Sequence, residues 1–292
     1  MMLKQQGINP KARELTQVCG RHIDRISGLA GACSTGEQPE GSPQTSPIPD
    51  SIPALRPDTD WREFRARLVG RTSTDNLSSQ AEPSTLESQL SHESLHWAHS
   101  IPAPEKGCLL LAHPLVFQER QKYFHQAAIL ILEHNEMGSY GLILNQPSVH
   151  TLGDLSLTQP LDEFKDCPLY LGGDVGGGEV HMIHPYNLPR SVEIVKGVYL
   201  GGIEAAAKMV ARKEADVKDF KWYARYAGWG PKQLERECKA GVWFTAAASA
   251  PLILSRPEGS ASTLWHNVLQ LMGGDYQELS INVRAQEERW KK

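Results

Sequence analysis

The chain has 292 residues, with 30 basic and 34 acidic side chains and a formal net charge of −4 at pH 7. This length fits one domain with extensions or two small domains, and the charge balance excludes the basic footprint that nucleic-acid binding by counterion release requires. No run approaches the roughly 18 apolar residues of a membrane span. The five cysteines are widely spaced and form no Cys-x-x-Cys pair, which argues against a disulfide framework and favours a reducing compartment.

The first 57 residues are predicted to form a disordered extension. Residues 36–57 contain six prolines and almost no apolar periodicity, so they lack the apolar surface that would offset the entropy cost of ordering. Residues 1–35 form a basic amphipathic segment of the kind found in organelle transit peptides, although Glu14 and Asp24 interrupt it. The alternative for this segment is a surface helix or a non-native upstream extension.

Short helices and a linker are expected over residues 58–99. The segment 58–69 has the apolar spacing of a helix. A second helix is expected over 84–98, where Ser84 and Glu87 form a capping box.

The second helix carries the sequence His92-Glu93-Ser94-Leu95-His96. Two histidines one helical turn apart could ligate zinc, with the glutamate between them as a general base. Pro102 and Pro104 end the helix within two turns, and no third ligand follows at a recognisable spacing. We therefore expect a packing helix and no metal site.

Beyond residue 100 the chain changes to short runs of β-forming residues that alternate with helical patterns. Strands are predicted at 108–112, 127–134, 140–145, 169–171, 180–184, 192–200, 220–227 and 242–248. Residues 135–139 predict a hairpin loop, and helices are predicted at 203–213, 231–240 and 263–272. Because some strands come in hairpins and others precede helices, the pattern indicates an α+β domain with a mixed sheet.

Two glycine-containing junctions are candidates for ligand contacts. Residues 172–178 (GGDVGGG) follow a strand but match neither phosphate-loop template, so a flexible hairpin loop is the preferred interpretation. Residues 226–231 (YAGWGP) form a strand–turn–helix junction, where Trp229 could either stack on a ligand or plug the end of the sheet. The plug is favoured.

Nucleophilic and acid–base residues give no clear constellation. Gly-x-Ser-x-Gly is absent, and Cys108 in a strand and Cys238 in a helix are expected to be buried and structural. Four histidines fall at or near predicted strand ends, where catalytic groups gather but where isolated histidines more often bind backbone carbonyls: His113, His134, His181 and His184.

Several short segments between residues 107 and 281 together resemble the AlgH family of bacterial and plant or algal proteins. They read LAHP (111–114), LEH (132–134), GLILNQP (141–147), LYLGG (169–173), YAGWGP (226–231) with QLE (233–235), and LMGG (271–274). Each is weak alone, but their order extends over about 175 residues. The segment Trp97-Ala98-His99 is similar to the plant and algal branch.

The resemblance implies a domain over residues 100–285 in which a mixed, partly barrel-like sheet is surrounded by helices, with a charged tail at 286–292. Members of the family have no established biochemical activity and often carry the label of transcriptional regulator, although this chain shows no helix-turn-helix or basic stripe. It departs from the family at two places: Gln146 stands where Arg is common, and the usual Pro near Asp174 is missing.

The favoured function is a non-enzymatic, regulatory domain that binds a small molecule or a protein partner, without direct contact with nucleic acid or a membrane. We expect no catalytic residue, no metal and no cofactor. The candidate ligand-binding residues are His113, Asn145, Gly172, Gly173, Asp174, His184, Gly228 and Trp229. The alternative is an enzyme for a small anionic or nucleotide-like substrate at the strand-end loops. Import into a chloroplast is expected, with a cytoplasmic location as the alternative.

Overall fold

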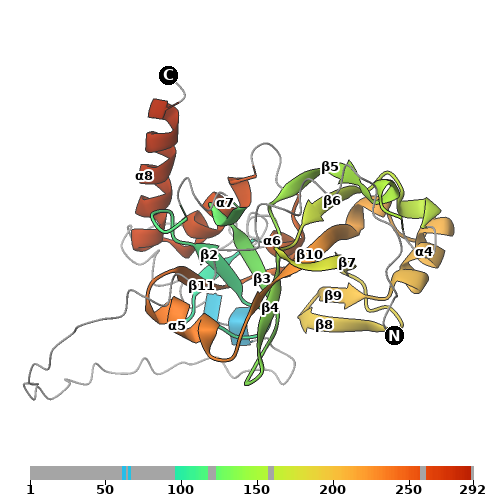
Figure 1. The fold of residues 1–292 in the computed structure, drawn as a ribbon, viewed down its shortest axis with the longest axis horizontal. Helices are drawn as coiled ribbons and strands as arrows, with labels where there is room; N and C mark the ends of the chain where they lie inside the picture. Colours follow the sequence, from blue (N-terminus) through green and yellow to red (C-terminus); the bar gives the residue numbers. More distant parts are fainter. Residues whose placement is uncertain are drawn as a thin grey trace, which may run out of the picture. The chain divides into compact units, whose positions relative to one another are not determined.

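A computed structural model describes residues 61–63, 65–66, 96–117, 123–156, 161–256 and 261–290, with the side chain of residue 290 left aside (Figure 1). The predicted N-terminal extension lies outside these residues, as do His92 to Leu95 of the histidine pattern and most of the expected helix at 84–98. His96 and Trp97 are not helical, and Ala98 already begins a strand. The expected helix therefore does not extend to residue 98.

The described residues form an α+β fold around a large sheet, which confirms the predicted class. The strands are β1 (Ala98–Ser100), β2 (Leu109–Ala112), β3 (Ala128–Asn135), β4 (Gly138–Ile143), β5 (Pro147–Thr151), β6 (Pro168–Leu171), β7 (Val175–His184), β8 (Ser191–Val195), β9 (Val198–Gly201), β10 (Lys221–Trp229) and β11 (Trp243–Ala248). The helices are α4 (Ile203–Ala211), α5 (Gln233–Lys239), α6 (Ala250–Leu254), α7 (Thr263–Met272) and α8 (Gly274–Trp290), with 3₁₀ turns at Leu152–Asp154, Asp162–Phe164 and Val217–Asp219.

Strand β10 joins the two parts of the sheet. The order is β1-β11-β2-β3-β4-β10-β7-β9-β8, and β5 and β6 attach beside β10. The last residues of β10 pair with β4, while its first residues lie between β7 and β6. Among the described strands, only the β6–β10 pair is parallel. A strand that runs through both parts is well placed to carry a functional site.

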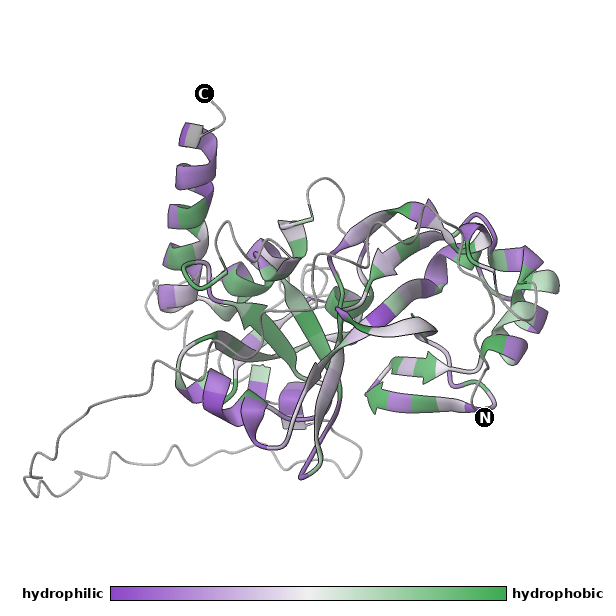
Figure 2. Ribbon diagram, viewed as in Figure 1, coloured by the Kyte–Doolittle hydropathy of each residue, from purple (hydrophilic) through white to green (hydrophobic). Residues whose placement is uncertain are grey.

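Both faces of the central strands are buried, which explains their nearly continuous apolar sequences. In β2, Leu109 and Leu111 face one core cluster, which α6 and α7 cover, while Leu110 faces a second cluster that contains Leu234 of α5. A third cluster lies beneath α4 and the 3₁₀ turn at 162–164. Figure 2 shows the hydrophobic colouring of β2 and β3 and the more polar α8, which packs on α7.

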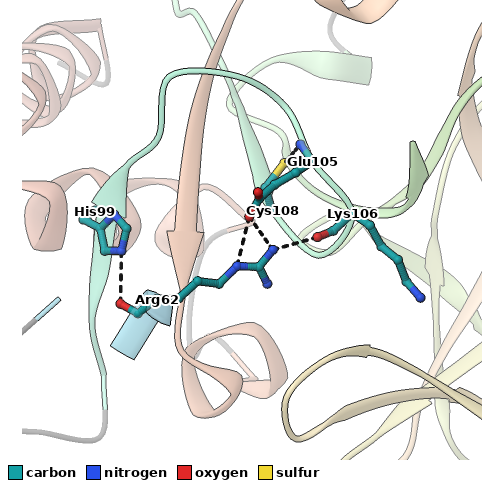
Figure 3. A network of polar contacts seen from close by, with 5 residues as sticks. All are labelled: Arg62, His99, Glu105, Lys106 and Cys108. Atoms are coloured by element: carbon teal, nitrogen blue, oxygen red, sulfur yellow. Dashed lines mark hydrogen bonds and ion pairs between the residues drawn. The ribbon is translucent and has the colours of Figure 1, made fainter. Parts of the chain in front are cut away.

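A helical segment at residues 61–63 and 65–66 docks on this domain from outside the predicted range 100–285 (Figure 3). The Arg62 guanidinium donates to the Glu105 carboxylate and, at 2.8 Å, to the Lys106 carbonyl oxygen. The Arg62 carbonyl oxygen lies 3.2 Å from Nε2 of His99 in β1. The helical residues 61–63 and 65–66 lie within the helix predicted at 58–69, whose other residues are outside the described ranges.

Most predicted elements are present with ends shifted by one or two residues, but two differ. The run 192–200 forms two strands, β8 and β9, because Lys196 and Gly197 make a tight turn with a φ of 80° at the glycine. The glycine-rich run 172–178 is not a hairpin loop throughout, since β7 begins at Val175. The sequence analysis also missed β1, β5, α6 and α8.

Candidate functional site

A β-bulge interrupts β10 where it passes from one part of the sheet to the other. Ala224 pairs with Val180 and Tyr226 pairs with Val175, so Arg225 on β10 faces four residues of β7. Arg225 has a φ of 67°, a left-handed conformation that costs a non-glycine residue about 1–2 kcal/mol. Bulges and strained residues of this kind concentrate near functional sites.

Gly172 and Gly173 bring the chain into direct contact with this bulge. The Gly172 N–H donates to the Ala224 carbonyl oxygen at 2.8 Å. A Cβ atom on Gly173 would lie 1.7 Å from the carbonyl carbon of Tyr226, so no other residue fits at this position. The Tyr123 hydroxyl donates to the Gly173 carbonyl oxygen. The two glycines therefore position Asp174 beside Arg225.

The polar side chains of this region are only partly buried. Burial raises the pKa of Asp174, and the nearby Arg225 guanidinium opposes the effect. Burial lowers the pKa of His181, whose Nε2 atom has no hydrogen-bond partner, and its ring stands edge-on to Tyr226 with centroids 6.1 Å apart. We call Gly172, Gly173, Asp174, His181, Arg225 and Tyr226 the bulge site.

Gly228 and Trp229 follow the bulge along β10. Gly228 pairs with Tyr140, and a Cβ atom built on it would lie 3.6 Å from Val175 Cγ2. Trp229 is 8% exposed, and its indole N–H donates to the Glu237 carboxylate of α5 at 2.9 Å. The burial of Trp229 agrees with the interpretation of this residue as a plug at the end of the sheet.

The other three candidates lie in separate environments whose contacts share no residue. Asn145 is buried, accepts from the Ala128 N–H and donates to two backbone carbonyl oxygens. His113 accepts from the Leu115 N–H, and its ring packs on Phe244. His184 is fully buried, its Nε2 donates to the Gly201 carbonyl oxygen at 2.8 Å, and burial lowers its pKa. The structure does not bring His113, Asn145 and His184 together.

Reactive groups are few in the described part of the chain. Burial raises the pKa of Cys108 and of Cys238 to about 12, so both thiols stay protonated at neutral pH. In the described ranges, no three His, Cys, Asp or Glu side chains are grouped as a metal site would need. None of the helices described here has the length and apolar character needed to cross a membrane.

A profile of AlgH-like proteins matches residues 109–277, more than half of the chain. The chain belongs to the AlgH-like family. Among its relatives, a UPF0301 protein from Chlorobium limicola is 30% identical over 175 residues, which cover 58% of this chain and 88% of the relative. A UPF0301 protein from Chlamydia abortus is 35% identical over 183 residues, with 60% and 90% covered. The names of these relatives state no activity.

A solved structure supports the fold. The crystal structure of protein DIP2367 from Corynebacterium diphtheriae aligns with a TM-score of 0.50 at 22% identity, covering 62% of this chain and 93% of that one. At this identity the likeness shows the fold alone. The profile match over residues 109–277 confirms the family that the resemblance over residues 107–281 predicted.

The AlgH-like domain also contains a serine–histidine–glutamate arrangement that the sequence analysis missed. His134 Nδ1 lies 2.7 Å from the Ser139 hydroxyl across the β3–β4 hairpin, and its Nε2 lies 3.9 Å from Glu235 Oε1 of α5. Ser139 is 7% exposed, and the histidine–glutamate distance exceeds that of a hydrogen bond. Glu235 is about 100 residues away in sequence, so no local motif could have indicated the pairing.

Proposed function

We propose that this AlgH-like chain is a non-enzymatic, regulatory domain that binds a small molecule or a protein partner at the bulge site. The observation that carries the proposal is the left-handed backbone of Arg225, held against two close-packed glycines and beside Asp174. The cost of such a conformation must be offset by the surrounding structure. A carboxyl, a guanidinium and a histidine with an unpaired nitrogen provide complementary polar contacts for a ligand.

The chemistry of the bulge site favours binding over catalysis. Within the described residues no hydrogen bond joins His181 to a carboxylate, and the lowered pKa of His181 keeps its ring neutral at pH 7. The aromatic wall of Tyr226 and Tyr140, with ring centroids 5.9 Å apart, suits a planar or apolar part of a ligand.

A thermal-shift screen with metabolites, nucleotides and metal ions tests this proposal. A ligand at 100 times its Kd should stabilise the protein by about 2.7 kcal/mol. Asp174→Asn and Arg225→Asn should each remove the shift, and asparagine keeps the tolerance for positive φ at position 225. Arg190→Gln, on an exposed ion pair with Glu204, is the matched control. A shift that survives both bulge-site variants would contradict the proposal.

The alternative function, an enzyme for a small anionic or nucleotide-like substrate, is favoured by one observation, the contact of His134 with Ser139 near Glu235. Incubation with nucleotides followed by chromatography of the products tests it. Turnover that disappears in His134→Asn would support the enzyme. An unchanged nucleotide pool would count against it.

The proposal also includes a regulatory role and a location in a plastid. The family label of transcriptional regulator is compatible with a domain that acts through a protein partner. Direct binding to DNA that weakens steeply with salt would contradict action through a partner. Membership of the plant and algal branch and import into a plastid rest on residues 1–35 and 97–99. Native protein that still begins at Met1 would argue against cleavage on import.

A further inference from the structure

Two cationic side chains meet beneath α6, at the opposite end of β10 from Trp229. Lys221 is 2% exposed, and its Nζ donates to the carbonyl oxygens of Ile253, at 3.4 Å, and Ser255. Arg256 follows α6, is partly exposed, and donates through Nη2 to the Phe220 carbonyl oxygen at 3.1 Å. Lys221 therefore caps the helix from within, while Arg256 connects the cluster with the surface.

No carboxylate of the described residues neutralises the charges of Lys221 and Arg256. Neither side chain forms an ion pair with a carboxylate among the residues that the structure describes. Burial first, and the positive charge of Arg256 second, lower the pKa of Lys221 to about 7. A buried cation without a counter-ion is costly, and charges in protein interiors are normally paired.

The same place holds polar hydrogens that have no acceptor. Tyr223 is two residues beyond Lys221 on the same face of β10, is fully buried, and its hydroxyl has no hydrogen-bond partner. Nε of Arg256 is also buried without a partner. Lys221 binds the carbonyl oxygen of Ser255, next to Arg256, and Arg256 binds the carbonyl oxygen of Phe220, next to Lys221, so the two cationic side chains lie close together. The positive charge of Arg256 also acts on Tyr223. The unpaired donors and the positive charges would both be satisfied by one kind of ligand, an anion with several acceptor oxygens.

We propose that Lys221, Tyr223 and Arg256 form a binding site for a phosphate group. A phosphate dianion matches two positive charges, and its oxygens can accept from the ammonium, the hydroxyl and the guanidinium together. Arg256 provides the side from which the anion enters. The site uses none of the bulge-site residues, so it does not rest on the function proposed above. The phosphate group belongs either to the free ion or to a phosphate monoester.

Thermal unfolding of the full chain with inorganic phosphate, with ribose 5-phosphate and with chloride at matched ionic strength tests the site. Phosphate or the monoester at 100 times its Kd should raise Tm by about 5–10 °C over chloride. When phosphate and ribose 5-phosphate are compared at one equal concentration, the ligand with the larger shift identifies the source of the phosphate group. Titration calorimetry should show about a tenfold loss of affinity in Tyr223→Phe and about a hundredfold loss in Arg256→Gln. Arg190→Gln should bind like the wild type.

Proton uptake provides a second readout that does not depend on how well a variant folds. A bound dianion should restore the charge of Lys221, so binding at pH 8 should take up a proton, seen as a heat that varies with the ionisation enthalpy of the buffer. The proposal would be overturned if phosphate gave no shift beyond that of chloride. It would also be overturned if Arg256→Gln and Tyr223→Phe bound phosphate as tightly as the wild type, which would indicate an adventitious ion only.

Discussion

Trp229 and Trp243 donate their indole N–H groups to one oxygen, Oε2 of Glu237, at 2.9 and 2.8 Å. The two rings stand edge to face with centroids 6.0 Å apart, and Gln233 donates to the other carboxylate oxygen at 2.8 Å. One glutamate on α5 thus ties the end of β10 to the start of β11. The carboxylate acts here as a structural brace, next to the junction that the sequence marked as a candidate site.

Glu237→Ala should destabilise the protein by about 3 kcal/mol, because two largely buried indole N–H groups lose a charged acceptor. Glu237→Gln keeps an amide oxygen in the same place and should cost about 1 kcal/mol. Urea unfolding followed by tryptophan fluorescence measures both. Equal stability of the alanine variant and the wild type would show that the indoles find other acceptors.

The positions of most strands along the chain were predictable because they depend on local patterns, whereas their order in the sheet was not predicted. In β2 and β3 alternate residues enter different core clusters, so the unbroken apolar runs at 108–112 and 127–134 already indicated strands buried on both faces. Helix α7 has the bounds predicted from its flanking residues. Helix α8 was missed because only one side of it, with Tyr276, Leu279 and Val283, packs on the core, and its overall composition is polar.

Gly173→Ala should prevent stable folding or cost more than about 3 kcal/mol, because the new Cβ atom would overlap the backbone of Tyr226. Gly241→Ala is the control. Gly241 has a φ of 74° and no atom within 4 Å of a built Cβ, so it should lose only about 1 kcal/mol through backbone strain. Thermal melts of both variants compare the two costs. A mild Gly173→Ala would mean that the loop can move away from β10.

Acid should loosen α8 before the rest of the protein. His266 of α7 is buried, its Nδ1 lies 2.9 Å from the Ser280 hydroxyl of α8, and burial followed by the Arg284 charge lowers its pKa while Glu287 opposes them. A histidine with a lowered pKa stabilises the fold above pH 6.5, and this contribution is lost as the pH falls below that value. Hydrogen exchange at pH 5 and pH 7, corrected for intrinsic rates, should show lower protection in α8 at pH 5. Protection that does not change, or that falls equally in His266→Gln, would contradict the mechanism.

Only some residues of the bulge site could be predicted from the sequence. Gly172, Gly173 and Asp174 stood out by composition, but their partner Arg225 did not, because a positive φ at an arginine leaves no mark in one sequence. The pairing of His181 and Tyr223 across β7 and β10 depends on register, which a one-residue bulge changes. Lys221 and Arg256 are 35 positions apart and meet only through the packing of α6 on the sheet.

The stability of the anion-free protein should rise between pH 7 and pH 8.5. Because the pKa of Lys221 falls from 10.5 to about 7 on folding, the unfolded chain binds one more proton than the folded chain in this range. The contribution of Lys221 to the free energy of unfolding therefore increases with pH, by at most about 1.4 kcal/mol per pH unit. Histidines titrate mostly below this window. Above about pH 8 the thiols of the unfolded chain begin to ionise while Cys108 and Cys238 stay protonated in the fold, which opposes the rise, so the effect of Lys221 is clearest between pH 7 and pH 8.

Lys221→Met isolates this effect, since methionine fills a similar volume without a charge. The variant should show a nearly flat dependence of unfolding free energy on pH from 7 to 8, whatever its absolute stability. Urea titrations at four pH values, in a buffer without phosphate, measure the slope. Adding phosphate should flatten the wild-type slope as well, because the bound anion keeps the ammonium charged. A wild type that is already flat without phosphate would show that Lys221 stays protonated in the fold, its charge compensated by the carbonyl oxygens at the end of α6 alone.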